Sequence, residues 1–246
     1  MNPVIEAIKS RKSVRQFEEK TIPSDIKEAI LEAAFQAPTA GNQMLYTIID
    51  VTDQNLKDQL AKTCDDQPFI AKAPLVLIFL ADTRRWLDAY VEAGLEVRQP
   101  GMGDLFLAMQ DAIIAAQNAV VAAESFGLGS CYIGDILENI ETHRDLLGLD
   151  PYTVPISMLV IGYPTEGQRT RTKPKRFERE FIVFENQYRR LTGEELRDMH
   201  QRQTTKPAYD FDAELQAFGK RKYMSDFSIE MNRSSEEYAK VFLKQK

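Results

Sequence analysis

Several stretches of the chain place apolar residues at helical spacing, and residues that start or stop helices bound these stretches. Pro3 suits the first turn of a helix, and the apolar stripe that follows it ends at a basic segment. A second helix is predicted from Ser24, a good N-cap residue, to Ala37, because Pro38 cannot continue it. Asp53 is expected to cap a third helix.

Residues 104–126 form the longest helical pattern in the sequence. Apolar residues, many of them alanine, cover most of its circumference, so we expect burial on most sides and close approach by neighbouring elements. We interpret part of this surface as a subunit interface; an ordinary central core helix is the alternative, and the two are compatible. Five polar or charged residues argue against a membrane span: Gln110, Asp111, Gln117, Asn118 and Glu124.

Uniformly apolar runs of strand length predict the centre of a sheet. Residues 75–81 and 156–162 have this pattern, which is typical of strands covered on both faces. Residues 46–52 form a further predicted strand. After the long helix, we expect a helix C-cap at Gly127, then a turn and a short strand that ends at Gly134.

Composition and charge narrow the class of protein. The 246 residues are 43% hydrophobic, which is enough for a sizeable core in one large domain. A formal net charge of -6 argues against duplex nucleic acid as a partner, because binding along a phosphate backbone needs broad positive charge. Cys64 and Cys131 suggest no disulfide framework, so a reducing cytoplasm is the expected compartment. Without a secretory signal pattern or an apolar run suited to a bilayer, we expect a soluble, unprocessed protein.

The chain beyond Pro164 is more polar than the part before it. Residues 165–176 are rich in Lys, Arg, Thr and Pro, and the remainder is charged with scattered aromatic residues. Such a tail is expected to cover little core of its own. Composition leaves three alternatives open: an arm that folds over a partner, a helical cap near a site, or a partly disordered segment.

The N-terminal basic segment is the clearest candidate for binding chemistry. Residues 11–17 place Arg11, Lys12 and Arg15 around the hydroxyl of Ser13. Guanidinium, ammonium and hydroxyl donors in this register suit a phosphate group. The alternative is a solvated basic patch that complements the negative C-terminal end of the preceding helix. The acidic background of the chain favours a dedicated anion site.

Other catalytic patterns are weak. The glycines of residues 127–134 do not fit the dinucleotide fingerprint, because their spacing differs and a helix precedes the loop where a strand is needed. Gly134 would instead let a planar ligand approach the backbone. His143 and His200 lie in charged helical surroundings, so both are expected at the surface. Without metal-ligand spacing, an organic cofactor is the favoured carrier of reactivity.

Seven segments carry a recognisable pattern, in this order: residues 11–17, 37–42, Gln67, residues 116–119, 127–134, 162–164 and 173–175. In these segments the chain is similar to the FMN-dependent nitroreductases, in particular the larger branch of NADPH-preferring nitroreductases and flavin reductases. The similarity covers roughly the first three quarters of the chain.

The resemblance implies an α+β fold, with a mixed, mainly antiparallel sheet flanked by helices, in an intertwined homodimer with two FMN sites at the subunit interface. On this basis residues 1–164 form the FMN-binding core. Residues 165–246 form a C-terminal extension of the same domain that wraps around the partner subunit. The predicted long helix then lies at the dimer interface.

The resemblance also assigns residues to the FMN phosphate. Four N-terminal donors are expected to bind the phosphate and the edge of the ring: Arg11, Lys12, Ser13 and Arg15. Lys173 and Lys175 are expected to complete the phosphate site. Lys175 stands where the family pattern has arginine, so a bidentate contact becomes a single one, and neighbouring Arg176 is a candidate to compensate.

Further residues are implied around the flavin ring. Thr39 and Gly41 are expected to line the flavin from the partner chain, and Gln67 to hydrogen-bond its pyrimidine end. Three consecutive residues are expected to turn their backbone toward the ring near N5: Tyr132, Ile133 and Gly134.

The implied activity is that of an oxidoreductase. Hydride passes from NADPH or NADH to flavin N5 and then to a nitroaromatic, a quinone or free flavin, in a ping-pong reaction without a catalytic side chain or a metal. Arg202 and Lys206 are candidates for the NADPH 2′-phosphate. The alternatives are a flavin-binding redox sensor or storage protein, a family relative with other flavin chemistry such as reductive dehalogenation, and an unrelated α/β domain with a fortuitous basic cluster.

Overall fold

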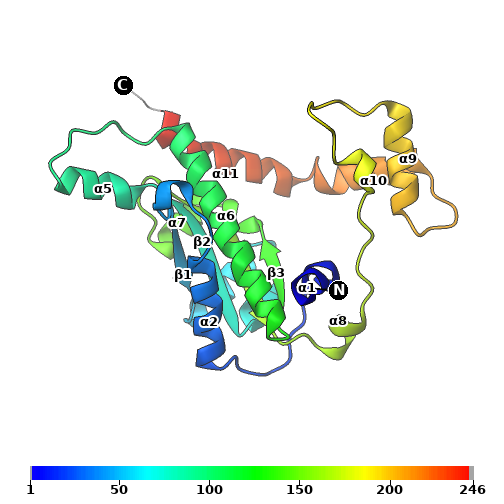
Figure 1. The fold of residues 1–246 in the computed structure, drawn as a ribbon, viewed down its shortest axis with the longest axis horizontal. Coiled ribbons are helices and arrows are strands. Elements are labelled where there is room, and N and C mark those ends of the chain that lie inside the picture. Colours follow the sequence, from blue (N-terminus) through cyan, green and yellow to red (C-terminus); the bar gives the residue numbers. More distant parts are fainter. Residues whose placement is uncertain (1, 244–246) are drawn as a thin grey trace. The chain divides into compact units, whose positions relative to one another are not determined.

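The computed structural model describes residues 2–243 and contains a four-stranded sheet (Figure 1). Its strands, in the spatial order β1-β2-β4-β3, are each antiparallel to their neighbours. They are β1 (Tyr46–Asp50), β2 (Leu75–Asp82), β3 (Gly129–Ile133) and β4 (Thr153–Gly162). The predicted central position of the two uniformly apolar strands, β2 and β4, is confirmed.

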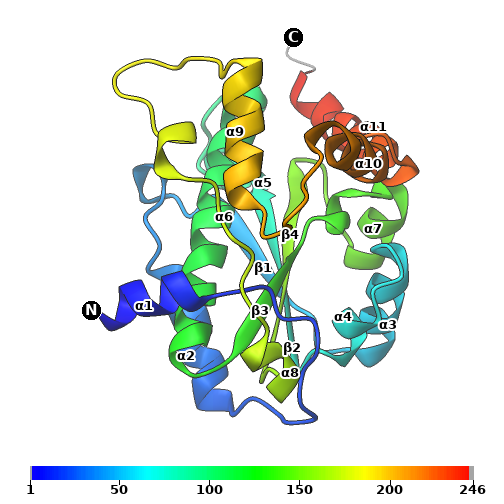
Figure 2. The ribbon, with the colours of Figure 1, turned by 90° about the vertical axis from the view of Figure 1, so that its right-hand side faces the viewer.

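Helices cover both faces of this sheet (Figure 2). On one face lie α2 (Ser24–Phe35) and α6 (Met102–Ser125), and on the other α3 (Gln54–Thr63), α4 (Pro68–Lys72) and α7 (Ile140–Leu147). Side chains of β2 alternate between the two cores, with Leu77 and Phe79 toward α6 and Ile78 on the opposite side. The predicted α+β class, with an antiparallel sheet flanked by helices, is confirmed.

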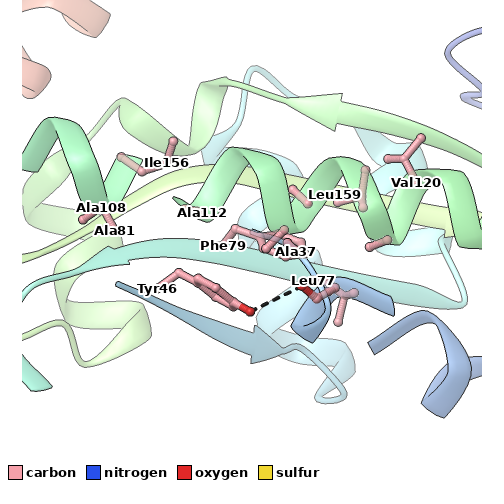
Figure 3. Close-up of a cluster of buried hydrophobic side chains, with 14 of the residues drawn as sticks. Ala37, Tyr46, Leu77, Phe79, Ala81, Ala108, Ala112, Val120, Ile156 and Leu159 are labelled. Carbon is pink, nitrogen blue, oxygen red and sulfur yellow. Dashed lines mark hydrogen bonds between the residues drawn. The ribbon is translucent and has the colours of Figure 1, made fainter. Parts of the chain in front are cut away.

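Alanines let α6 pack closely on the sheet (Figure 3). The fully buried ones are Ala108, Ala112, Ala115, Ala116, Ala119 and Ala123. Below them, Tyr46 on β1 donates a hydrogen bond from its hydroxyl to Ala34 O on α2, at 3.3 Å. The alternative interpretation of residues 104–126, a central core helix, is therefore confirmed, and the subunit interface stays a prediction. Four large apolar side chains of the same helix remain exposed: Phe106, Leu107, Ile113 and Ile114.

The N-terminal segment after α1 (Pro3–Ser10) runs along the edge of the sheet. Val14 N donates to Ser130 O on β3 at 2.9 Å. Two strand glycines leave room for this segment. A Cβ on Gly129 would lie 2.5 Å from a methyl group of Val14, and one on Gly162 would lie 2.7 Å from the ring of Phe17. Residues 11–17 are thus fixed beside β3.

The chain divides into two units, one formed by residues 1–171 and 230–246 (unit 1) and the other by residues 172–229 (unit 2). Unit 1 also contains the short elements η1 (Ala40–Asn42), α5 (Arg84–Glu92), η2 (Asp135–Leu137) and α8 (Glu166–Thr170). Unit 2 contains η3 (Arg179–Phe181), α9 (Gly193–Gln203) and α10 (Phe211–Lys222). The helix α11 (Asp226–Leu243) begins in unit 2 and continues in unit 1.

The last helix contradicts the expectation that the tail covers little core. Tyr238 and Phe242 on α11 are buried in the main core of unit 1, where Phe242 packs edge-on against Tyr152 with ring centres 5.3 Å apart. The polar composition of the tail hid this role, because the inward side of α11 carries few residues and they are spaced one helical turn apart.

Candidate functional site

Three residues of the N-terminal basic segment gather around strand β3. The guanidinium carbon of Arg11 lies 5.9 Å from the centre of the Tyr132 ring. The buried Nε of Arg11 has no hydrogen-bond partner among residues 2–243. Burial raises the pKa of Cys131, while Arg15, the Ser13 hydroxyl and Arg11 act in the opposite direction. The structure therefore brings Arg11, Ser13 and Arg15 together.

Lys12 makes a different set of contacts. Its ammonium group donates to two backbone oxygens, Arg169 O at 2.6 Å and Arg171 O at 2.5 Å. The guanidinium of Arg171 in turn donates to Ser13 O. Arg171 was not selected from the sequence, although the basic composition of residues 165–176 pointed to this stretch. It joins the candidate anion site, and Lys12 holds the segment that carries it.

The backbone at the end of β3 is open on one side. Tyr132, Ile133 and Gly134 follow one another there, and a Cβ built on Gly134 would meet no described atom within 4 Å. The Tyr132 hydroxyl hydrogen-bonds to Gln117 Oε1 at 3.3 Å. Burial raises the pKa of Tyr132 to about 12, so the phenol keeps its proton at neutral pH. The open side at Gly134 suits the close approach of a planar ligand.

The loop that carries Gln67 lies against the loop after β3. Asn139 Nδ2 donates to Thr63 O at 3.0 Å and joins the two loops. Gln67 Nε2 donates to Cys64 O at 2.8 Å, and the two aspartates before Gln67 both adopt left-handed φ angles. The structure thus places Gln67 and Gly134 on adjoining loops.

The expectation that both histidines lie at the surface is wrong for His143. Its ring is completely buried, with Nδ1 3.0 Å from Ile136 O and Nε2 2.8 Å from Thr63 Oγ1. Burial lowers the pKa of His143. Its charged sequence neighbours misled the prediction, because they occupy the other side of the short helix α7. His200 is half-buried between the rings of Phe177 and Phe211 in unit 2.

A cysteine also lies next to His143, but it lacks the features of a nucleophile. Cys64 Sγ is 4.0 Å from His143 Nε2, although 79 positions separate the two residues in the sequence. Both side chains are completely buried, and burial raises the pKa of the Cys64 thiol. Nucleophilic catalysis needs an accessible thiolate, which this site does not provide. Among residues 2–243, no group of three His, Cys, Asp or Glu side chains is placed to bind a metal.

Glu138 is a buried carboxyl group that directly follows η2, on the loop after β3. It is 6% exposed, and its Oε1 has no hydrogen-bond partner in the described part of the chain. Burial raises the pKa of Glu138 to about 7, and the negative charges of Asp135, Asp65 and Glu230 add to this rise. Near neutral pH, a large share of Glu138 therefore carries a proton.

The loop that carries Thr39 and Gly41 contacts α6 at a different level from the basic segment. The Thr39 hydroxyl donates to the Asp111 carboxylate, whereas Arg11 lines a small pocket with Gln117. Position 117 lies six residues further along the helix than position 111, a rise of about 9 Å. Within one chain, the loop at Thr39 and the basic segment therefore make separate contacts with the same helix.

A cavity of about 500 Å³ adjoins the loop that contains Thr39. It lies between α5, the connection to α6 and the first turns of α6. Its walls combine aromatic, aliphatic and charged side chains, among them Gln43, Trp86, Tyr90, Arg98 and Leu107. None of the phosphate-binding candidates from the N-terminal segment lines it.

The basic residues predicted in the C-terminal extension all belong to unit 2: Lys173, Lys175, Arg202 and Lys206. Arg202 pairs with three carboxylates, Glu178 at 3.1 Å, Glu180 at 2.7 Å and Asp198 at 2.5 Å. Lys175 donates to Arg202 O, and Lys206 donates to the Glu214 carboxylate. Their assignment to phosphate groups stays a prediction.

Comparison with known proteins gives consistent matches. Residues 8–163 match the model of the nitroreductase family. An oxygen-insensitive NADPH nitroreductase from Salmonella typhimurium is 34% identical over 191 residues, which cover 78% of this chain and 77% of that protein. An FMN reductase (NAD(P)H) from Bacillus subtilis is 30% identical over 178 residues, 71% of this chain and 70% of that protein. The structure of B. megaterium NfrA2 superposes with a TM-score of 0.82 at 27% identity, covering 97% of this chain and 98% of that one.

Replacing Glu138 with glutamine tests the buried carboxyl. The pKa of Glu138 is raised from 4.5 to about 7. Between these two pH values the folded protein therefore binds more protons than the unfolded chain. Stability contributed by the protonated group is thus lost as pH rises through the window. We expect Glu138→Gln to match the wild type in Tm at about pH 5 and to exceed it at about pH 8. Glu92→Gln, at an exposed position on α5, is the control, and an equal Tm difference at both pH values would contradict the assignment.

Proposed function

The chain belongs to the nitroreductase family, and we propose that it is an FMN-dependent oxidoreductase that moves hydride from NADPH or NADH to planar electron acceptors. The observation that carries this proposal is the position of Arg11, Ser13 and Arg15 beside β3, whose far end has an open backbone at Gly134. The residues beside β3 can thus donate hydrogen bonds to a phosphate, and the open backbone at its end can contact the face of a planar ring. Nitroaromatics, quinones and free flavin are the proposed acceptors.

The donors near Arg11 fit the phosphate of FMN. A bound phosphate would give the buried Nε of Arg11 the hydrogen-bond acceptor that residues 2–243 do not supply. Ser13 and Arg15 add a hydroxyl and a second guanidinium, and Arg171 lies next to Ser13 O. Lys12 contributes by holding the backbone that carries Arg171. From unit 2, we propose Lys173 and Lys175 as further phosphate ligands.

The ring of FMN is proposed to lie along the end of β3. The backbone from Tyr132 to Gly134 would face N5, and Gln67 on the adjoining loop would hydrogen-bond the pyrimidine end. Thr39 and Gly41 would contact the ring from the partner subunit. The separate contacts of their loop and of the basic segment with α6 support this division between two subunits.

FMN, when bound, supplies the atom that accepts hydride from the nicotinamide and returns it to the acceptor. The side chains of this protein therefore have no need to act as nucleophile, acid or base; they bind and orient. The positive charges of Arg11 and Arg15 would also stabilise negative charge on the bound cofactor. Because reductant and acceptor would occupy the same space in turn, ping-pong kinetics are expected.

We propose a homodimer in which α6 supplies much of the interface. Phe106, Ile113 and Ile114 follow the i, i+7, i+8 spacing of one helix face and are 39–55% exposed in the single chain. The helix α1 adds further exposed apolar residues, Val4, Ile5 and Ile8. A second copy of this chain would cover these surfaces. Unit 2 would then serve as the arm that wraps around the partner.

We propose that either NADPH or NADH serves as the reductant. Arg202 and Lys206 remain the proposed ligands of a 2′-phosphate, but the described carboxylates already pair with both. Neither alternative activity, a redox sensor or a reductive dehalogenase, gains support from a specific contact. The named relatives are a nitroreductase and an FMN reductase.

A soluble, cytoplasmic location is part of the proposal. Of the residues described, only those of α6 form a helix that is long and apolar enough to span a bilayer. The same helix carries the buried Asp111 and packs its alanines on the sheet, as a core helix does. The net charge of -6 argues against nucleic acid as a partner.

An absorption spectrum of the purified protein, followed by anaerobic addition of NADPH or NADH, tests the activity. We expect a flavin spectrum that either reductant bleaches and that an added quinone or nitroaromatic restores. Initial rates at several concentrations of both substrates should give parallel double-reciprocal lines. A colourless protein that takes up no added FMN would overturn the proposal, and intersecting lines would contradict a shared site.

The Arg15→Ala variant tests the phosphate assignment. Loss of a charge-assisted contact should weaken FMN binding about tenfold or more, measured by flavin fluorescence on titration of the apoprotein. The control is Arg84→Ala, which removes the same charge from α5 and should leave FMN affinity unchanged. Equal affinity in the Arg15 variant and the wild type would show that the phosphate lies elsewhere.

The Ile113→Glu variant tests the proposed dimer. A charge at this position would have to be buried in the interface without a partner, so we expect monomers in sedimentation velocity at concentrations where the wild type is dimeric. FMN retention should fall with it, because each site would need both subunits. Ile113→Val keeps the surface apolar and should remain dimeric. A dimeric Glu variant would exclude this face of α6 from the interface.

A further inference from the structure

Asp111 is a buried carboxylate on α6 whose hydrogen bonds all go to one loop. Its side chain is 3% exposed. One oxygen, Oδ1, accepts from Ala40 N at 3.1 Å; the other, Oδ2, accepts from Leu45 N at 3.1 Å and from the Thr39 hydroxyl. The Thr39 oxygen itself accepts from Met44 N at 2.8 Å. A single helix residue thus fixes both ends of the segment 39–45.

This segment has a backbone that needs such support. Gly41, Asn42 and Met44 have φ angles of 58°, 58° and 49°, so three of four consecutive residues lie in the left-handed region. For residues other than glycine this conformation is unfavourable and persists only where surrounding contacts determine it. With only one short 3-10 turn inside it, the loop depends on contacts from neighbouring elements for its shape.

Side chains of α5 hold the opposite side of the loop. Trp86 Nε1 donates to Gln43 O at 2.7 Å, and Arg85 Nη1 donates to Met44 O at 3.3 Å. These bonds satisfy carbonyl groups, whereas Asp111 is the acceptor for backbone N–H groups at both ends. The carboxylate therefore has a role that the α5 contacts do not duplicate.

We propose that Asp111 is a positioning residue that holds the segment 39–45 in the conformation in which it contacts FMN in the partner subunit's site. This inference rests on the proposed function, which places Thr39 and Gly41 against the flavin. Asp111 itself does not touch the cofactor. It sets the direction of the Thr39–Gly41 backbone and thereby the fit of the loop to the ring.

The requirement is for a carboxylate and not for any polar group of this size. Asparagine is nearly isosteric, but its NH₂ group can only donate. If the NH₂ group takes the place of Oδ1, it faces the N–H group of Ala40. If it takes the place of Oδ2, it faces the N–H group of Leu45, so two donors oppose each other in both orientations. Either orientation leaves one backbone N–H at the end of the loop without its acceptor, so Asp111→Asn should relax the loop while α6 keeps its packing.

The test compares Asp111→Asn with Asn118→Ala, a variant of the same helix. Asn118 donates to Ala33 O on α2 at 3.1 Å and makes no hydrogen bond to the loop within residues 2–243, so its loss should lower Tm without altering the loop. FMN affinity is measured by titration of each apoprotein, and the visible circular dichroism of the bound flavin is recorded at saturating FMN. Tm of each apoprotein reports stability separately.

We expect Asp111→Asn to weaken FMN binding about tenfold and to change the circular dichroism of the bound flavin. Asn118→Ala should lower Tm with unchanged affinity and spectrum. Equal FMN affinity and an unchanged flavin spectrum in Asp111→Asn would overturn the positioning role while leaving the proposed function intact. A wild-type protein that binds no FMN would overturn both.

A second variant covers the case in which Asp111→Asn does not fold. Thr39→Val keeps the buried carboxylate and removes the hydroxyl that links it to Met44 N. This loop variant should show the same two changes, a weaker FMN affinity and an altered flavin spectrum. Wild-type values for both would overturn the role of the Asp111–Thr39 contact in positioning the loop.

Discussion

The close packing of α6 on the central sheet is the constraint on which the other features depend. Its buried alanines bring the helix axis near β2 and β4, and several parts of the proposed site in unit 1 are held by this helix. Asp111 holds one loop, Gln117 contacts Tyr132, and Asn118 fixes the end of α2. Larger residues at the alanine positions would move all these contacts together.

The basic side chains of the proposed site differ in the contacts that they make. The Nε of Arg11 remains without a partner in the described chain, while Lys12 is bound to backbone oxygens and supports the segment of Arg171. In unit 2, carboxylates surround Arg202. A cluster of basic residues in a sequence is therefore not equivalent to a cluster of available donors, because some of the cations hold the backbone in place.

Burial explains why three side chains that resemble catalytic groups, Cys64, His143 and Glu138, lack the reactivity of such groups. Cys64 and His143 lie close together, but the absence of water around them favours the neutral forms of both side chains. Burial and acidic neighbours raise the pKa of Glu138, which likewise favours its neutral form. Of these residues, His143 links the segments next to the Gln67 and Gly134 loops through its contacts with Thr63 and Ile136. We assign His143 a structural role beside the proposed site, and the reactive chemistry to the cofactor.

The sequence alone determined the elements that depend on local pattern. Apolar periodicity located β2, β4 and α6, Asp53 capped α3 through a bond to Leu56 N, and ordered short motifs indicated the family. Contacts between residues far apart in the chain were decided only by the tertiary structure. They include the burial of His143, the return of α11 to the core, the engagement of Lys12 with backbone oxygens and the attachment of the Thr39 loop to Asp111. The physical reason is that periodicity reports which side of an element is apolar, whereas the partner that a buried polar group finds depends on how distant segments are packed together.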